Sequence, residues 1–334
     1  MQLCLYPHRL WRDIILSDSG KFWRWANLRV DYLSQYSVIN SRMLYIVPAI
    51  KISWNTSLGM VESLLQAVSE GETPVLKQIS ATALTQVSPE ILAGAAANLE
   101  RLQVDLLSFT QLEFILAKIA GHHTKLRKLS CCFPRPSLSG MDPDILAEAV
   151  IRLEIGNFLP GHLSPAQELS LFSKIKDSPD LRLTELSHSL SSNINIVPPE
   201  VFAGAVSRLE SADLSALVTS DQLEALFRML ISYQAGAGDP ILKQLELMSP
   251  RLTSPEVLVG AIQRLEKVVL IGRITADHIT AVLLMVINNR QGRLKYIEFE
   301  LSCSEDFVPP NLSTLIPLAR QNNAVRIKFC RLQV

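Results

Sequence analysis

The sequence lacks an apolar run long enough to cross a membrane, and it lacks an excess of charge of either sign. Its longest uninterrupted apolar run, 281–287, has seven residues, whereas a spanning helix needs about 20. Lysine and arginine number 32 and aspartate and glutamate number 32, so the formal net charge is zero. We therefore expect neither a membrane nor a nucleic acid as partner.

Cysteine is scarce, and its spacing does not suit a metal. The chain has 5 cysteines, of which Cys131 and Cys132 are adjacent. An odd number without ligand spacing indicates a reduced compartment, so we expect an intracellular protein of the cytoplasm or nucleus. The charged residues Arg9, Arg12 and Asp13 stand where a secretory signal would need an apolar core, which argues against secretion.

Sequence motifs of catalytic sites are also missing. The chain has no Gly-rich phosphate loop, no Gly-x-Ser-x-Gly turn and no Cys-x-x-Cys pair. The adjacent His122 and His123 favour a solvated loop over a metal site, because neighbouring side chains diverge and no further ligand is suitably spaced. We therefore expect no catalytic residue, no metal and no cofactor. A hypothesis of another class is an enzyme that uses His122, His123 or Cys132, and alanine substitution at these residues would test it.

What the sequence has instead is one motif in four copies. The copies begin at Pro89, Pro143, Pro199 and Pro255, at intervals of 54, 56 and 56 residues. In each copy an acidic residue follows the proline, and a leucine lies ten positions after it. A fixed period over most of a chain indicates stacked units of secondary structure.

Segments with the pattern Leu-x-x-Leu-x-Leu predict short strands between helices. One set follows the proline-containing helices, at 99–104, 153–158, 209–214 and 265–270. A second set lies between them, at 76–81, 126–131, 183–188, 242–247 and 294–299. Outer strands are expected at 47–52 and 324–329. Each long unit is then two half-repeats of about 23–33 residues, each with one strand and one helix.

This pattern resembles leucine-rich repeats, and the paired long units are similar to the ribonuclease-inhibitor type. The resemblance implies an α/β solenoid, a horseshoe with parallel strands on its concave face and helices on its convex face. The chain departs from the family after the strands, where Asn or Cys normally bonds the turn. That place holds Leu84, Leu107, Pro134, Leu217, Pro250 or Arg273. We therefore expect irregular turns.

The proline-containing helices carry signals for how they begin and how they pack. Ser88, Asp142 and Ser254 stand as predicted N-caps before the proline, and Pro198 takes that place in the third copy. The acids of the first turn favour the helix dipole, so we assign a structural role to Glu90, Asp144, Glu200 and Glu256. Close approach of a neighbouring element is predicted at Gly94, Gly204 and Gly260, whereas the second copy has Glu148.

A Leu-Glu pair begins each strand of the first set. Its acids could form one negative rim, at Glu100, Glu154, Glu210 and Glu266. We expect the cations beside them in the sequence to neutralise that rim, at Arg101, Arg152, Arg208, Arg264 and Lys267.

Residues 1–40 differ from the rest of the chain, with three of the four tryptophans and an expected strand at 28–30. The run Leu10-Trp11-Arg12, followed by Trp23-Arg24-Trp25-Ala26-Asn27-Leu28, resembles the C-terminal half of an F-box. The Leu-Pro motif and apolar helix that precede this half in the family are not in the sequence. The resemblance implies that Leu10, Trp11, Trp23 and Trp25 face a ubiquitin-ligase adaptor. Alternatively, these residues cap the repeat array.

We divide the chain into a truncated F-box-like or capping segment, 1–40, and a leucine-rich repeat domain, 41–334.

Strand side chains that point away from the helices form the predicted binding surface. Its candidate residues are Arg101, Gln103, Lys128, Glu185, Gln244, Glu246, Lys267, Tyr296 and Glu298. The same orientation is expected for Gln78, Ser80, Ser130, Ser187 and Val269. Mixed charge suits a protein partner better than a phosphate backbone, and Tyr296 is the best anchor because aromatic residues are enriched in hot spots.

The leading hypothesis is therefore a protein-interaction module. The F-box resemblance implies a substrate receptor of a ubiquitin ligase that holds a protein partner on the concave repeat face. The alternative is a free-standing leucine-rich repeat scaffold or inhibitor with no ubiquitin-ligase link.

Overall fold

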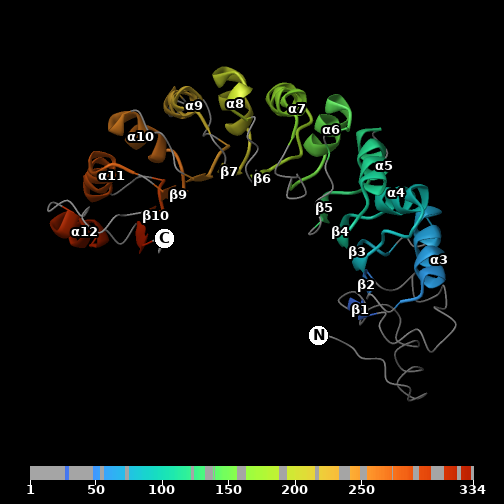
Figure 1. Ribbon diagram of the computed structural model, residues 1–334. Helices are drawn as coiled ribbons and strands as arrows, with labels where there is room; N and C mark the ends of the chain where they lie inside the picture. Colours follow the sequence, from blue (N-terminus) through green and yellow to red (C-terminus); the bar gives the residue numbers. More distant parts are fainter. Residues whose placement is uncertain are drawn as a thin grey trace, which may run out of the picture. The chain divides into compact units, whose positions relative to one another are not determined.

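Two compact units make up the chain, Met1–Pro160 and Gly161–Val334. The computed structural model describes residues 27–29, 48–52, 56–71, 75–121, 124–131, 138, 140–155, 163–187, 194–214, 218–232, 241–248, 254–272, 274–288, 293–301, 312–321 and 325–331. Each unit has its own sheet, with helices along one side of it (Figure 1). The boundary between residues 40 and 41, and the horseshoe shape, stay predictions.

The first unit contains a five-stranded sheet in which every strand pairs with its neighbour in chain order. The strands are β1 (Asn27–Arg29), β2 (Ala49–Ile52), β3 (Gln78–Ala83), β4 (Arg101–Leu106) and β5 (Lys128–Cys131), all parallel. The helices are α3 (Leu58–Ser69), α4 (Pro89–Asn98), α5 (Phe109–Ala120) and α6 (Pro143–Ile151).

The second unit contains a six-stranded parallel sheet, again with neighbours in chain order. Its strands are β6 (Glu185–Ser187), β7 (Ser211–Leu214), β8 (Gln244–Met248), β9 (Lys267–Gly272), β10 (Tyr296–Leu301) and β11 (Arg326–Arg331). Its helices are α7 (Pro165–Asp177), η3 (Ile194–Ile196), α8 (Pro199–Val206), α9 (Ser220–Ser232), α10 (Pro255–Ile262), α11 (Ala276–Asn288) and α12 (Leu312–Arg320).

The predicted alternation of strand and helix is confirmed, and the strand motifs fall on named strands with one exception. In the segment 153–158, Ile155 forms an isolated parallel bridge to Lys128, and the residues after it lie outside the described ranges. The strand expected at 28–30 is found at Asn27–Arg29. Parallel strands joined by helices need right-handed crossovers of a dozen or more residues, which these half-repeats provide.

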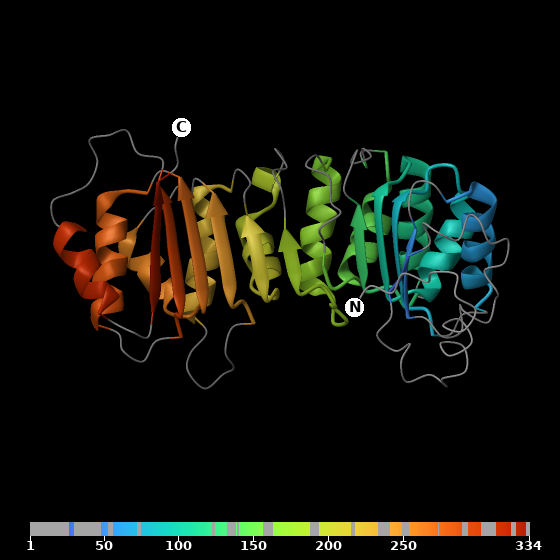
Figure 2. The same cartoon turned by 90° about the horizontal axis from the view of Figure 1, so that it is seen from below.

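The core of each unit lies between its sheet and its helices. In β4, Leu102 and Val104 are fully buried, whereas Arg101 and Gln103, which alternate with them along the strand, are exposed. This two-residue alternation places apolar side chains toward the helices and polar ones on the opposite sheet surface. In each unit taken by itself, the strands lie on one side and the helices on the other, and Figure 2 shows the strands in front of the helices. We call the surface of each sheet that faces away from the helices its open face.

Three glycines mark close approaches between successive helices, as predicted. A methyl group at Gly94 would lie 2.0 Å from Ser69 Oγ of α3, and one at Gly204 would lie 3.0 Å from Lys176 Cγ of α7. At Gly260 the nearest atom is Ile231 Cδ1 of α9, at 2.9 Å. The prediction from the repeat is thus confirmed as helix-to-helix contact.

Ser88, Asp142 and Ser254 occupy the predicted N-cap positions, but the expected side-chain cap bond is found only at Asp142. Asp142 accepts hydrogen bonds from the backbone N–H groups of Asp144 and Ile145, at 2.8 and 3.1 Å. Ser88 and Ser254 make no such cap bond. Their hydroxyls donate instead to carboxylate oxygens of the first helical turn, because the acid after the proline lies within 2.5 Å.

Side-chain capping is found at the other set of helices, which begin with Ser or Thr three residues before a buried polar side chain. Ser108 and Gln111 bond reciprocally at the start of α5, and Gln111 Nε2 also donates to the carbonyls of Leu84 and Val87, at 2.6 and 2.7 Å. The glutamine therefore ties α5 to the loop between β3 and α4, which belongs to the preceding half-repeat.

Within the described ranges, no helix is both long and apolar enough to span a membrane.

Candidate protein-interaction surface

The open face of the second unit carries two rows of side chains set by the strand register. One row consists of Glu185, Ser211, Gln244, Lys267, Tyr296 and Arg326. The next row consists of Ser187, Asp213, Glu246, Val269, Glu298 and Lys328. Paired residues on neighbouring strands lie about 5 Å apart, so each row is a continuous line of potential contacts.

A hydrogen-bonded cluster lies at the β9–β11 end of these rows. Tyr296 Oη donates to Glu298 Oε2 at 2.6 Å, and Lys328 Nζ donates to Glu298 Oε1. Lys267 Nζ lies 5.9 Å from the centre of the Tyr296 ring, within the range of a cation–π contact. Three strands thus hold one tyrosine in place. We call Lys267, Tyr296, Glu298 and Lys328 the tyrosine cluster.

Electrostatics in this region follow from burial and from neighbouring carboxylates. The hydrogen bond to Glu298 raises the pKa of the Tyr296 hydroxyl above its usual value, since the proton is shared with a carboxylate. Burial, followed by the negative charge of Asp213, raises the pKa of Glu246, and the Lys267 ammonium opposes that rise. Glu298 is 8% exposed, and its ion pair with Lys328 compensates for that burial.

The open face of the first unit is built in the same way but with different residues. Arg101 and Lys128 are paired across β4 and β5, and Gln103 pairs with Ser130. Arg101 and Gln103 are exposed, and Lys128 Nζ lies 3.7 Å from Glu154 Oε2. This face offers cations and neutral polar groups, with one acid, Asp105, near the end of β4.

The structure therefore distributes the predicted binding residues over two sheets. Glu185, Gln244, Glu246, Lys267, Tyr296 and Glu298 lie on the second sheet, and Arg101, Gln103 and Lys128 lie on the first. Val269 stands in the open-face row between Glu246 and Glu298, as its predicted orientation requires, but its side chain is only 6% exposed. Four predicted adaptor-facing or capping residues lie outside the described ranges, namely Leu10, Trp11, Trp23 and Trp25. So do His122, His123 and Cys132.

Sequence reasoning missed Lys51, Asp213 and Lys328 as members of the open faces. The signal was present for Lys328, since it stands between Ile327 and the next apolar residue of an expected outer strand. The same alternation marks Lys51 between Ile50 and Ile52. Both follow from extending the period of two to the outer strands.

The acidic rim is neutralised, but by cations of neighbouring half-repeats rather than by those adjacent in the sequence. The ion pairs are Lys77–Glu100 at 2.8 Å, Arg127–Glu154 at 3.1 Å, Lys243–Glu210 at 3.3 Å and Lys295–Glu266 at 2.6 Å. The cations expected to do this are not the partners in these four ion pairs, namely Arg101, Arg152, Arg208, Arg264 and Lys267. Arg152, for example, bonds Glu148 of its own helix at 2.6 Å.

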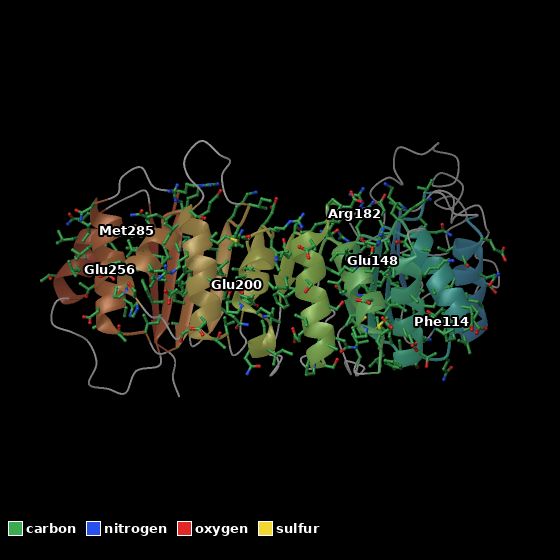
Figure 3. All side chains as sticks on the ribbon, turned by 90° about the horizontal axis from the view of Figure 1, so that it is seen from above. Phe114, Glu148, Arg182, Glu200, Glu256 and Met285 are labelled. Atoms are coloured by element: carbon green, nitrogen blue, oxygen red, sulfur yellow. The ribbon has the colours of Figure 1, made fainter. Side chains whose placement is uncertain are left out.

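The acids of the first helical turns lie on the helix side, away from the open faces. Figure 3 shows this side, with Glu200 on α8 and Glu256 on α10. The hydrogen bonds from Ser88 and Ser254 lower the pKa of Glu90 and Glu256, respectively. These local bonds support the structural role assigned to the acids. Within the described ranges, no three His, Cys, Asp or Glu side chains are grouped so as to hold a metal.

Comparisons with known proteins give distant structural likenesses. No family model matches the sequence, and no curated protein matches it. A leucine-rich repeat-containing protein, LegL7, from Legionella pneumophila is 14% identical over 89% of this chain and 97% of its own, with a TM-score of 0.44. A protein from Bacteroides fragilis is 11% identical over 91% of this chain and 72% of its own, with a TM-score of 0.32. Both likenesses are too low to carry an argument about function.

Proposed function

We propose that this chain is a non-enzymatic repeat scaffold of the leucine-rich repeat type that binds a protein partner on its open faces. The observation that carries the proposal is the tyrosine cluster of the second unit. There, an aromatic ring is fixed by a hydrogen bond to Glu298 and flanked by Lys267. In the finer form of the proposal the two units form one horseshoe, with the open faces on its concave side.

The tyrosine cluster has the properties of an interaction hot spot. Tyrosine offers a large contact area with few rotatable bonds, and a ring already held by hydrogen bonding loses little further freedom on binding. The surrounding charges are of both signs, because Lys267 and Arg326 stand in the row that contains Glu185. Such mixed surfaces favour a protein partner.

Affinity capture with the intact chain tests this function. Wild type is compared with Tyr296→Ala/Lys267→Glu and with a control that makes the same two kinds of change on the helix side, Phe114→Ala/Lys118→Glu. Phe114 is 39% exposed on α5, and Figure 3 shows it on the helix side. Mass spectrometry should find a protein that the wild type and the control retain and the cluster variant loses. Equal retention by all three would overturn the proposal.

The ubiquitin-ligase receptor is a finer hypothesis that rests on the F-box resemblance of residues 10–28. The same capture tests it with Trp23→Ala/Trp25→Ala. Recovery of ligase adaptor subunits that this variant loses would support the receptor. Partner capture without adaptor subunits would support the free-standing scaffold instead.

A further inference from the structure

The open face of the first unit differs in charge from that of the second. On β2 to β5, its charged side chains are Lys51, Arg101, Lys128 and Asp105. On the second unit, by contrast, acids predominate, at Glu185, Asp213, Glu246, Glu298 and Glu300 against Lys267, Arg326 and Lys328. The two faces therefore select for partner surfaces of opposite sign.

The cations of the first unit are available for an external partner. Lys51 and Arg101 are exposed, and in the part of the chain that the structure describes neither forms an ion pair. Lys128 shares the carboxylate of Glu154 with Arg127, at the longer distance of 3.7 Å against 3.1 Å. Asp105 stands on the same face near the end of β4, away from the Arg101–Lys128 pair at its start.

The spacing of these cations matches an extended acidic segment. Lys51 on β2 stands in the row of Ser80, Gln103 and Ser130, two residues along the strands from the row of Arg101 and Lys128. Three strand intervals of about 4.8 Å and that step of about 6.8 Å place Lys51 about 16 Å from Lys128. In an extended peptide, alternate side chains point the same way and lie about 6.8 Å apart. Carboxylates at the first and third of three alternate positions, about 13.6 Å apart, thus reach Lys51 on one side of the face and the Arg101–Lys128 pair on the other.

The remaining groups favour a protein over a nucleic acid. The register places Ser80, Gln103 and Ser130 side by side across β3, β4 and β5, where they can bond a peptide backbone. Strands β2 to β5 carry no aromatic side chain, whereas binding of single-stranded RNA depends on stacking against aromatic rings.

We infer that the open face of the first unit, centred on Lys51, Arg101 and Lys128, docks an extended acidic segment of a protein partner. This inference rests on the proposed function and names the partner chemistry of one of its two faces. Acidic side chains of the segment pair with the three cations, and its backbone bonds the neutral row of Ser80, Gln103 and Ser130. Binding weakens as salt rises, because the attraction is between exposed charges.

The experiment measures fluorescence anisotropy of a labelled peptide with glutamates at alternate positions, titrated with the full chain at low ionic strength. We expect wild type to bind it and Lys51→Glu/Arg101→Glu to lose affinity by about tenfold or more, since two attractions become repulsions. The neutral variant Lys51→Gln/Arg101→Gln should be intermediate. Among single variants with an equal change of charge, Arg101→Glu should weaken binding and Lys118→Glu, on the helix side, should not.

Two further ligands test whether binding depends on the acidic charge of the peptide and whether a peptide is preferred over RNA. A peptide with lysines in place of the glutamates should not bind this face, and a single-stranded RNA of equal length should bind more weakly than the acidic peptide. Tighter RNA binding, or acidic-peptide binding that Lys51→Glu/Arg101→Glu leaves unchanged, would overturn the inference. Failure here with retention of a captured protein that depends on Tyr296 would leave the proposed function standing.

Discussion

His278 occupies a helix position that glutamine holds elsewhere in the repeats. Gln222 at the start of α9 donates to the carbonyls of Ile194 and Val197, each at 2.7 Å. In α11 the imidazole of His278 is bonded through Nδ1 to Thr275 Oγ1 at 2.5 Å and is 6% exposed. An ionisable group therefore stands where the other helices use a neutral amide.

Burial of His278 predicts a loss of stability at mildly acidic pH. Desolvation lowers the pKa of its imidazole, with Asp277 and Glu256 opposing that change. Since the unfolded chain has a histidine pKa near 6.5, it binds more protons than the folded state below that pH. The contribution of His278 to the free energy of unfolding should thus be constant above about pH 7.5 and fall as the pH drops through 6.5, by at most about 1.4 kcal/mol per pH unit.

Denaturant titrations of wild type and His278→Gln between pH 5 and 8 measure this contribution. Glutamine keeps the hydrogen-bonding shape found in the other helices and does not titrate, so the variant should lose the pH dependence that wild type shows. Parallel curves for the two proteins would contradict the prediction.

The close approach of Ser69 on α3 decides the effect of a methyl group at Gly94. Alanine normally stabilises a helix interior by about 1 kcal/mol relative to glycine. Here its Cβ would lie 2.0 Å from Ser69 Oγ and 3.1 Å from Ser69 Cβ, so Gly94→Ala should destabilise the chain by about 1–3 kcal/mol. Thermal unfolding is the measurement.

The matched control for Gly94 is the third copy of the motif. At Gly204 the nearest atoms belong to the flexible stem of Lys176, at 3.0–3.4 Å, so Gly204→Ala should be neutral or mildly stabilising. Adding Ser69→Ala to Gly94→Ala removes the shorter contact and should restore part of the loss. An equal effect of the two glycine substitutions would show that the helix contact is not the cause.

Arg208 joins two helices by bonding the carbonyl end of α7. Its guanidinium donates to the carbonyls of Ile175, Lys176 and Ser178, at 2.8, 2.6 and 2.6 Å. A cation at a helix C-terminus is favourable, and hydrogen bonds from a charged donor are stronger than neutral ones. Arg208→Ala should therefore cost about 1–2 kcal/mol of unfolding free energy.

Hydrogen exchange at the C-terminal turn of α7, with denaturant titration, checks the role of Arg208. Arg208→Lys keeps the charge but not the planar fork of donors, so its cost should be intermediate. Arg228→Ala is the control, because Arg228 bonds Glu224 on the surface of one helix and such pairs are worth about 0.3–0.5 kcal/mol. A cost for Arg208→Ala no larger than this control would exclude the capping role.

The sequence predicts which side chains of a strand are buried, but it does not predict which hydrogen-bond partner a side chain finds after packing. The alternation of apolar and polar residues predicted that Leu102 and Val104 are buried while Arg101 and Gln103 face outward, because burial follows the strand period. The partners of Ser88 and Arg208 were not predicted. They depend on which of several acceptors comes nearest after packing, and residue spacing alone does not decide this.

At the scale of the whole molecule, the strands form two sheets rather than one. The sequence predicted a uniform series, since the motif at 153–158 has the same spacing as the others. Among the described residues, Ile155 forms an isolated bridge to Lys128 of β5, and β6 begins the second sheet, while 156–162 lie outside the described ranges. Repeat patterns report the period of the chain, but they do not report where a run of backbone pairing stops.

Separate ladders predict that damage to one core spreads mainly within its own sheet. Leu102 on β4 and Leu245 on β8 are both buried, at 0% and 2% exposure, so replacing either with alanine should cost about 2–5 kcal/mol. Hydrogen exchange should show that Leu102→Ala lowers protection in β3, β4 and β5 far more than in β7, β8 and β9. Leu245→Ala should give the reverse pattern, because repeat units transmit stability chiefly through neighbouring rungs. If either substitution lowered protection equally in both sheets, the two units would behave as one cooperative array.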